Sequence, residues 1–311
     1  MKKTLIIGSY NVGLAVIGDK IPAVGETVMG REFEMGPGGK GSNQAIALAR
    51  LKAPMKFMCR VGDDHFGQDA LLLFKKENIS LDAIRVVPGY HTGVGVILID
   101  KNGYNAIGVA PGANYQLSIE DLLANLELFI EADYMLIQLE CRLEVVEKAI
   151  ELARDHDVKV IFNPAPAQEI SDTTLARTDF ITPNETEAEI MSGVVVTDRE
   201  SAAKAAKVLM NRGALNVIIT MGDKGCLWVS RDGQQFFNAY KVDTVDSTGA
   251  GDAFNAGLVF GLANNFTIPD SIDFGSRVAA LSVTKMGTVN GLPTSEEVLS
   301  FDAQSHNQPK K

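Results

Sequence analysis

The residues from Asp243 to Leu262, DTVDSTGAGDAFNAGLVFGL, contain the clearest arrangement of groups for chemistry in the chain. The glycine-bearing turn Gly249-Ala250-Gly251 stands directly before Asp252, and apolar residues with helical spacing follow. The turn is therefore predicted at a helix N-terminus, where the first backbone N–H groups lack intrahelical acceptors and the macrodipole is positive. Such a turn can bind an anion or stabilise negative charge that develops during a reaction.

Asp252 would lie beside that anion site. A carboxylate there can accept the proton of a substrate hydroxyl while the N–H groups stabilise a transferring phosphoryl group. The alternative interpretation is an ordinary N-cap aspartate that closes a helix after a glycine turn. This stretch alone does not decide between the two.

A second glycine-rich stretch, GPGGKG at 36–41, matches the G-x-G-x-x-G fingerprint of dinucleotide-binding proteins, with Asp63 and Asp64 at about the expected distance. It would make the protein an NAD-dependent oxidoreductase. Two features disfavour this alternative. The stretch follows a ribbon of alternating polarity instead of the first buried strand, and Pro37 interrupts the fingerprint. Such an enzyme also leaves residues 243–262 unexplained.

The same stretch is not a Walker A loop, because Lys40 is followed by Gly41. We expect a glycine-rich loop from Gly36 to Gly41 that leads into a helix from about Ser42. Its glycines would let a sugar-sized ligand approach the backbone, and Asn43 offers both a donor and an acceptor.

Asn184 and Glu187 open another predicted helix after a strand. Three residues apart, they lie on one helix face and could together orient water around Mg²⁺. The alternative is a capping box, with Asn184 as N-cap and Glu187 as its N3 partner, and the two interpretations are compatible.

Composition excludes several classes of function. The chain has 311 residues, 46% of them hydrophobic, and a formal net charge of −10, which argues against a nucleic-acid or anionic-membrane partner. The three cysteines have no metal-binding or redox spacing, and no run of apolar residues is long enough to span a membrane. The apolar run after MKK is too short for a signal peptide, so we expect a cytoplasmic protein.

From about residue 118 the predicted strands and helices alternate, which indicates an α/β fold with a mostly parallel sheet covered on both faces. One continuous helix is expected over 118–131. Ligands of such sheets bind at the carboxyl ends of the strands, and polar residues follow several of them: Glu140, Asn163, Asn184, Glu187 and Gly222. Residues 91–100 and 104–109 read as a hairpin.

The motifs together resemble the ribokinase-like carbohydrate kinases of the phosphofructokinase B group, and within it the ribokinases. GGKGSNQA at 38–45 and DTVDSTGAGDAFNAG at 243–257 look like the two family signatures. VGDDHFG at 61–67, LIQLE at 136–140, NPAPA at 163–167, TPNETEAE at 182–189 and TMGDKG at 220–225 are also similar, in the same order.

The resemblance implies a three-layer sandwich with a small β-sheet lid. We expect residues 1–10, 37–88 and 110–303 to form the α/β core, residues 11–36 and 89–109 to form the lid, and residues 304–311 to be a disordered tail. A homodimer through the lid is also implied.

The implied activity is transfer of the γ-phosphoryl group of ATP to a hydroxymethyl group of a small sugar, with ribose as the first choice. Asp252 would be the base, and the amides of Gly249, Ala250, Gly251 and Asp252 the anion hole. The sugar would contact Asn11, Gly39, Lys40, Asn43, Glu140 and Asp252; the nucleotide would lie near Asn184, Thr220, Gly222 and Gly225.

The implied cofactors are Mg²⁺, ordered by Glu187 and Asn184, and K⁺, held by backbone carbonyls at Asp246, Thr248, Ser282, Lys285 and Gly287. Two positions depart from the family pattern: Gly291 stands where a serine is usual, and Gly13 where an aspartate usually accepts bonds from two sugar hydroxyls. A nucleoside kinase, a kinase of another pentose or ketohexose, and a sugar-binding regulator without activity remain alternatives, although the presence of Asp252, Gly249 and Gly251 counts against the regulator.

Overall fold

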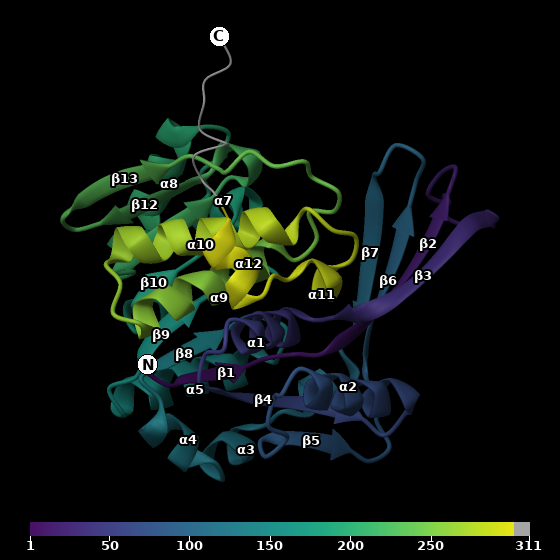
Figure 1. The fold of residues 1–311 in the computed structure, drawn as a ribbon, viewed down its shortest axis with the longest axis horizontal. Coiled ribbons are helices and arrows are strands. Elements are labelled where there is room, and N and C mark those ends of the chain that lie inside the picture. The colour runs from purple at the N-terminus through teal and green to yellow at the C-terminus, as the bar shows by residue number, and fades with distance from the viewer. Residues whose placement is uncertain (302–311) are drawn as a thin grey trace.

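Residues 1–301 are described by the computed structural model (Figure 1). A nine-stranded sheet, in the order β13-β12-β11-β10-β9-β8-β1-β4-β5, runs through its centre. Neighbouring strands from β11 across to β5 are parallel, whereas β12 pairs antiparallel with β11 and β13. The strands are β1 Thr4–Ile7, β4 Met55–Gly62, β5 Ile84–Val87, β8 Tyr134–Ile137, β9 Lys159–Phe162, β10 Phe180–Ile181, β11 Asn216–Thr220, β12 Cys226–Ser230 and β13 Gly233–Phe237.

Helices cover both faces of this sheet, which confirms the predicted three-layer α/β sandwich. One face packs against α3 Ile119–Leu123, α4 Leu126–Glu131, α5 Leu143–Asp155, α6 Asp172–Ala176, α7 Glu185–Ser192 and α8 Arg199–Asn211. The other packs against α1 Lys40–Arg50, α2 His65–Lys76, α9 Ala250–Ala263, α10 Ile268–Ser282, α11 Thr288–Gly291 and α12 Ser295–Ser300. Two short 3₁₀ helices, η1 Gly112–Gln116 and η2 Gly222–Lys224, complete the described elements.

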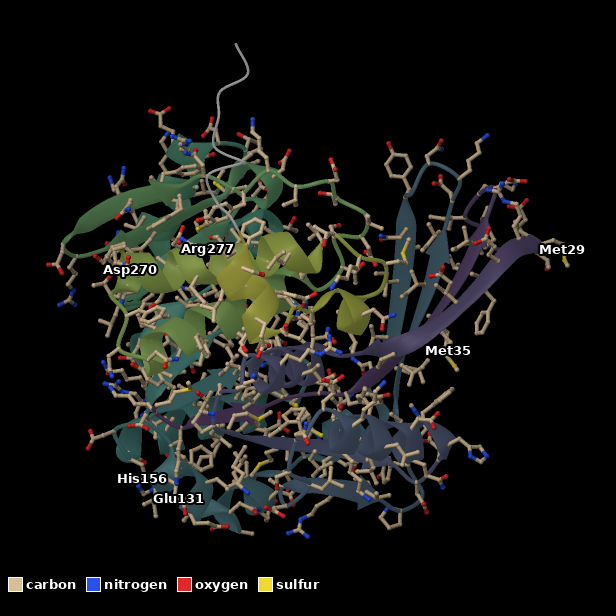
Figure 2. The ribbon with its side chains drawn as sticks, in the orientation of Figure 1. Met29, Met35, Glu131, His156, Asp270 and Arg277 are labelled. Carbon is tan, nitrogen blue, oxygen red and sulfur yellow. The ribbon has the colours of Figure 1, made fainter. Side chains whose placement is uncertain are left out.

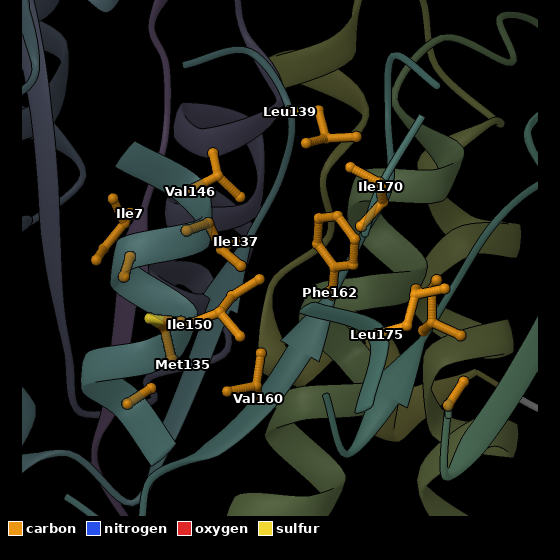
Figure 3. Packing of buried hydrophobic residues seen from close by; sticks show 14 of the residues in the cluster. Ile7, Met135, Ile137, Leu139, Val146, Ile150, Val160, Phe162, Ile170 and Leu175 are labelled. Carbon is orange, nitrogen blue, oxygen red and sulfur yellow. The ribbon is translucent and has the colours of Figure 1, made fainter. Parts of the chain in front are cut away.

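The sheet has a hydrophobic core on each face, because successive side chains along a strand point to opposite faces. In β8, Met135 and Ile137 point into one core, while Leu136 points into the other. Figure 3 shows Met135 and Ile137 packed against Val146 and Ile150 of α5. Because both faces of the central strands are buried, their sequences are continuous apolar runs, as expected of a covered parallel sheet.

A separate four-stranded sheet, in the order β3-β2-β6-β7, projects from the body at the right of Figure 1. Its strands are β2 Asn11–Gly18, β3 Gly30–Gly38, β6 Gly93–Ile99 and β7 Asn105–Ala110. β6 and β7 pair antiparallel around the turn at Gly103, so the hairpin prediction is confirmed.

Two local predictions were wrong, and one element was missed. The expected loop from Gly36 to Gly41 is mostly regular structure, since β3 continues to Gly38 and α1 already begins at Lys40. The expected helix over 118–131 is two helices, and Asn125 between them donates from its side chain to the backbone oxygen of Asp121. The β12–β13 hairpin was not predicted.

No helix among residues 1–301 combines the length and apolar character that a membrane crossing requires. The tail predicted at residues 304–311 lies outside the described residues.

Candidate active site

Polar side chains gather at the carboxyl edge of the central sheet. Four of them follow strands β1, β8, β9 and β10, in that order Ser9, Glu140, Asn163 and Thr182, and Thr220 is the last residue of β11. The N-termini of α1 and α9 reach the same edge, because Lys40 N donates to Glu140 and Asn43 donates to Asp252. This is the position at which open α/β sheets bind ligands.

A cavity of about 150 Å³ lies at this edge. Its lining comes from segments far apart in the sequence: Lys40, Asn163, Ala165, Thr182, Asn184, Glu187, Thr220, Ser247, Gly249, Ala250, Gly251, Asp252 and Asn255. A larger cavity of about 560 Å³, lined by residues such as Met55 and Glu77, contains none of the predicted site residues.

The start of α9 forms the predicted turn. Gly249 is the N-cap with φ 80°, and a Cβ there would lie 2.3 Å from the Cγ2 atom of Thr288, so only glycine fits. The backbone N–H groups of Gly251 and Asp252 donate to no acceptor within residues 1–301. Asn255 donates from Nδ2 to the oxygen of Gly251 at 2.8 Å, and this bond fixes the peptide plane that carries the N–H of Asp252. The turn is thus built to bind an anion.

The carboxylate of Asp252 is 5% exposed and accepts two bonds from α1. Asn43 Nδ2 donates to Oδ2 at 2.8 Å, and Gln44 Nε2 donates to Oδ1 at 3.0 Å. Burial raises the pKa of Asp252 above its usual range, although Lys40 and the two amides act in the opposite direction. A carboxyl group with a raised pKa is well suited to accept a proton from a hydroxyl group.

Lys40 is the cation of the site. Burial lowers the pKa of its ammonium group, but the nearby carboxylates of Asp252, Glu140 and Glu187 raise it, and the net pKa lies above the usual value. Lys40 is therefore charged at neutral pH, in the same cavity as Asp252.

Glu140 is held by three neighbours. Its Oε2 atom accepts bonds from the Ser9 hydroxyl and from Lys40 N, the latter at 2.7 Å, and its Oε1 atom accepts from Asn11 Nδ2 at 3.3 Å. Asn114 fixes Asn11 in turn by donating to its Oδ1 atom at 2.8 Å. Gly39, with φ 91°, lets the backbone pass close to Asn11, since a Cβ would lie 2.7 Å from Asn11 N.

Asn184 and Glu187 form the capping box at the start of α7. Asn184 Oδ1 accepts from Glu187 N, and Glu187 Oε2 accepts from Asn184 N, both at 2.8 Å. Both residues also line the cavity, and the capping bonds use only part of their acceptor capacity. Burial raises the pKa of Glu187, partly opposed by Asn184 N and Lys40.

Comparison with known proteins decides the family. Residues 1–295 match the family model described as pfkB family carbohydrate kinase. The chain belongs to the pfkB family of carbohydrate kinases. It is 41% identical to the ribokinase of Haemophilus influenzae, over 97% of this chain and 99% of that protein. It is 36% identical to the deoxyribokinase of Salmonella typhi, over 94% and 96% of the two chains.

Solved structures agree with this assignment. Ribokinase of Thermotoga maritima superposes with a TM-score of 0.86 at 33% identity, covering 96% of this chain and 99% of the other. Ribokinase of Arabidopsis thaliana superposes with a TM-score of 0.87 at 26% identity, covering 97% of this chain and 99% of the other. The predicted family, fold and enzyme class, a phosphotransferase acting on a sugar, are therefore confirmed.

The structure of this pfkB kinase brings most of the predicted site residues together. Lys40, Asn184, Glu187, Thr220 and Gly249 to Asp252 line one cavity, and hydrogen bonds connect Asn43, Glu140 and Asn11 to it. Gly222 and Gly225 lie beyond this lining, in the turn between β11 and β12. The dinucleotide alternative does not fit, because Gly36 and Gly38 belong to β3 of the small sheet, which pairs antiparallel with β2.

The five predicted potassium positions lie in two adjoining segments of the kinase. Asp246 joins them, because its carboxylate accepts from Thr248 N at 2.9 Å and from Gly287 N at 3.0 Å. A Cβ on Gly291 would lie 2.3 Å from the oxygen of Ser282 and 3.7 Å from that of Lys285. These two carbonyl oxygens therefore converge beside Gly291, a donor set suited to a hard cation.

Six polar residues in or behind the kinase site were not predicted. Thr182 and Asn255 line the cavity; Ser9, Gln44 and Asn114 hydrogen-bond to predicted site residues; and Gln138 lies behind them, bonded to Gln44. Thr182 and Gln138 follow β10 and β8, so position at a strand's carboxyl end was a usable signal. Gln44 and Asn255 lie on helices, where their types alone do not distinguish them from surface amides.

Proposed function

We propose that the protein transfers the γ-phosphoryl group of Mg·ATP to the hydroxymethyl group of ribose. The observation that carries the proposal is the buried carboxylate of Asp252 beside the N–H groups of Gly251 and Asp252, which have no acceptor among residues 1–301. Asp252 accepts the proton of the attacking hydroxyl, and the amides of residues 249–252 stabilise the charge on the phosphoryl group in transit. Lys40 adds a positive charge in the same cavity.

The sugar occupies the space bordered by Asn11, Gly39, Asn43 and Glu140. Asn43 supports this placement, because its Oδ1 atom is buried without a hydrogen-bond partner in the described part of the chain, while its Nδ2 atom donates to Asp252. A buried acceptor without a donor is costly, and a sugar hydroxyl would satisfy it. The Arabidopsis thaliana ribokinase structure is a complex with ribose and ATP, which favours the same two substrates here.

A second candidate acceptor is 2-deoxyribose, and the small sheet favours it. Gly36, Gly13 and Gly95 form one row across β3, β2 and β6, on the same face as Asn11. A Cβ on Gly36 or Gly95 would meet nothing within 4 Å, so these positions of the row offer no side chain to a hydroxyl pair. The similarity to a deoxyribokinase supports the same candidate, and the open row would also admit a nucleoside.

The nucleotide lies along the turn after β11, next to Asn184, Thr220, Gly222 and Gly225. Mg²⁺ fits the carboxylate of Glu187 and the amide oxygen of Asn184, because oxygen ligands that keep several waters are what this ion requires. Bound there, the ion neutralises phosphate charge. K⁺ fits the carbonyl oxygens at Asp246, Thr248, Ser282, Lys285 and Gly287, where it would hold the two segments beside Gly249.

The small sheet acts as a lid and as the interface of a homodimer. Phe33, Met35 and Val96 lie on one of its faces and are 63%, 57% and 48% exposed. Ile107 and Val109, on the other face, are 59% and 55% exposed. In Figure 2, Met29 stands at the outer tip of this sheet, away from the body, and Met35 lies nearer the body. An apolar surface of this extent is typical of an interaction site. The lid comprises residues 11–36 and 89–109, and its closure excludes water from the phosphoryl group.

The cysteines support a cytoplasmic location, since Cys59, Cys141 and Cys226 are all buried as free thiols.

The test is ADP release from Mg·ATP with ribose, 2-deoxyribose, fructose and adenosine, with and without K⁺. We expect release that depends on the acceptor and is greatest with one of the two pentoses. Release that is independent of the acceptor, or strongest with adenosine, would contradict the proposal.

A further inference from the structure

Gln44 is a fully buried polar residue that no part of the proposed mechanism uses directly. It follows Asn43 on α1, and each of the two amides donates to a different oxygen of the Asp252 carboxylate. Asn43, which borders the proposed sugar site, donates to Oδ2, and Gln44 donates to Oδ1. The second oxygen of the base therefore has its own dedicated donor.

The orientation of the Gln44 amide is fixed on both sides. Its Oε1 atom accepts from Gln138 Nε2, and its Nε2 atom also donates to Asn163 Oδ1 at 3.1 Å. Asn163 is fixed in turn, because its own Nδ2 atom donates to the backbone oxygen of Thr182 at 3.3 Å. The NH₂ end of Gln44 must therefore face the carboxylate, and it cannot rotate without breaking these bonds.

The charged groups that face Asp252 are few. Lys40 comes from α1, Glu140 follows β8, and Glu187 comes from α7. Two of these three are carboxylates, which oppose ionisation of Asp252, and burial opposes it as well. Against them, hydrogen bonds to the ionised carboxylate favour the charged form that a general base must have.

We propose that Gln44 is a positioning residue of the phosphoryl-transfer site, which holds Oδ1 of Asp252 so that the carboxylate stays ionised with Oδ2 directed at the acceptor hydroxyl. The proposal rests on the proposed function for its catalytic meaning, but the hydrogen bond and its effect on Asp252 can be measured separately.

The substitution Gln44→Met keeps the volume and removes the donor. We expect the acidic limb of the pH profile of kcat/KM to move up by about one pH unit, because a charge-assisted bond to the ionised form is lost. The value of kcat at the optimum should fall by about tenfold, because the carboxylate loses its fixed direction.

Gln138→Met is the matched control. It removes an equally buried amide from the same cluster, but Asn163 still fixes the orientation of Gln44, and Gln138 makes no bond to Asp252. We expect its acidic limb to stay within about 0.3 pH units of the wild type. If both variants moved the limb equally, or neither did, Gln44 would contribute packing alone and the proposal would be overturned.

A second measurement does not depend on activity. The carboxyl signal of Asp252 can be titrated by NMR in protein with isotope-labelled aspartate, with Asp252→Asn to assign it. We expect Gln44→Met to raise the titration midpoint relative to Gln138→Met. If the wild type phosphorylated no sugar, the proposed function would fail while this titration still decided the role of Gln44; equal midpoints in the two variants would overturn it.

Discussion

Asn43 donates a hydrogen bond to Asp252 at 2.8 Å, while the other end of its amide, Oδ1, is buried with no partner among residues 1–301. The pair joins the start of α1 to the start of α9, so the two signature segments of the sequence meet in one hydrogen bond. The same bond leaves the acceptor oxygen of Asn43 next to Asp252, where the proposed function places a sugar hydroxyl.

The substitution Asp252→Asn should lower kcat by about a thousandfold, because the general base is lost. The protein should still fold, since Asn43 can turn its amide so that its unpartnered Oδ1 accepts from the new NH₂ group. Steady-state kinetics with ribose and a thermal melt measure both effects. An active Asp252→Asn variant would exclude Asp252 as the base.

The raised pKa of Asp252 also predicts that the stability difference between the wild type and Asp252→Asn depends on pH. The folded protein holds the proton of Asp252 at pH values where the unfolded chain has released it, because the pKa is raised on folding. Rising pH therefore favours the unfolded state, and the free energy of unfolding of the wild type should fall relative to Asp252→Asn as the pH rises from about 4 to neutrality. Urea melts of both proteins across this range measure the difference, and a constant difference would argue against the raised pKa.

Much of this architecture could be predicted from the sequence. The covered strands are apolar runs in the sequence, and the turn before Asp252 combines glycines with an acidic residue, so the sheet and the helix start at this turn could both be predicted. The extent of β3 could not be predicted, because Gly36-Pro37-Gly38 has the composition of a loop and becomes a strand only through pairing with β2. The role of Gln44 was hidden for a similar reason, since its partners Gln138, Asn163 and Asp252 reach it only through the fold.

Lys40→Met should lower kcat/KM by about a hundredfold, because the cavity loses the cation that opposes its carboxylates. The acidic limb of the pH profile should also move up, since Lys40 lowers the pKa of Asp252. Lys52→Met is the matched control: Lys52 pairs with Glu296 on the surface, outside the site cavity, and its loss should leave both quantities unchanged.

Glu187→Gln separates capping from metal binding. Glutamine can still accept the bond from Asn184 N, so the capping box and the melting temperature should be retained. The loss of a negative ligand should raise the Mg²⁺ concentration for half-maximal rate by about tenfold. A Mg²⁺ titration at saturating ATP measures this, and an unchanged midpoint would place the metal elsewhere.

Gly13→Asp tests the acceptor. A Cβ at this position would have Ile97 Cδ1 as its nearest neighbour, at 3.6 Å, so the side chain has room on the face that carries Asn11. An added carboxylate should favour ribose over 2-deoxyribose in kcat/KM by about tenfold or more, because it can accept a bond from the extra hydroxyl. An unchanged ratio would mean that this face does not contact the sugar.

The central claim is phosphoryl transfer from ATP to a pentose with Asp252 as base. It is tested most directly by following the labelled γ-phosphoryl group of ATP into products, with ribose or 2-deoxyribose as acceptor and with wild-type and Asp252→Asn protein side by side. We predict that the wild type moves the label into a sugar monophosphate and that the variant does not. Label found only in inorganic phosphate, or transfer that survives in Asp252→Asn, would contradict the account.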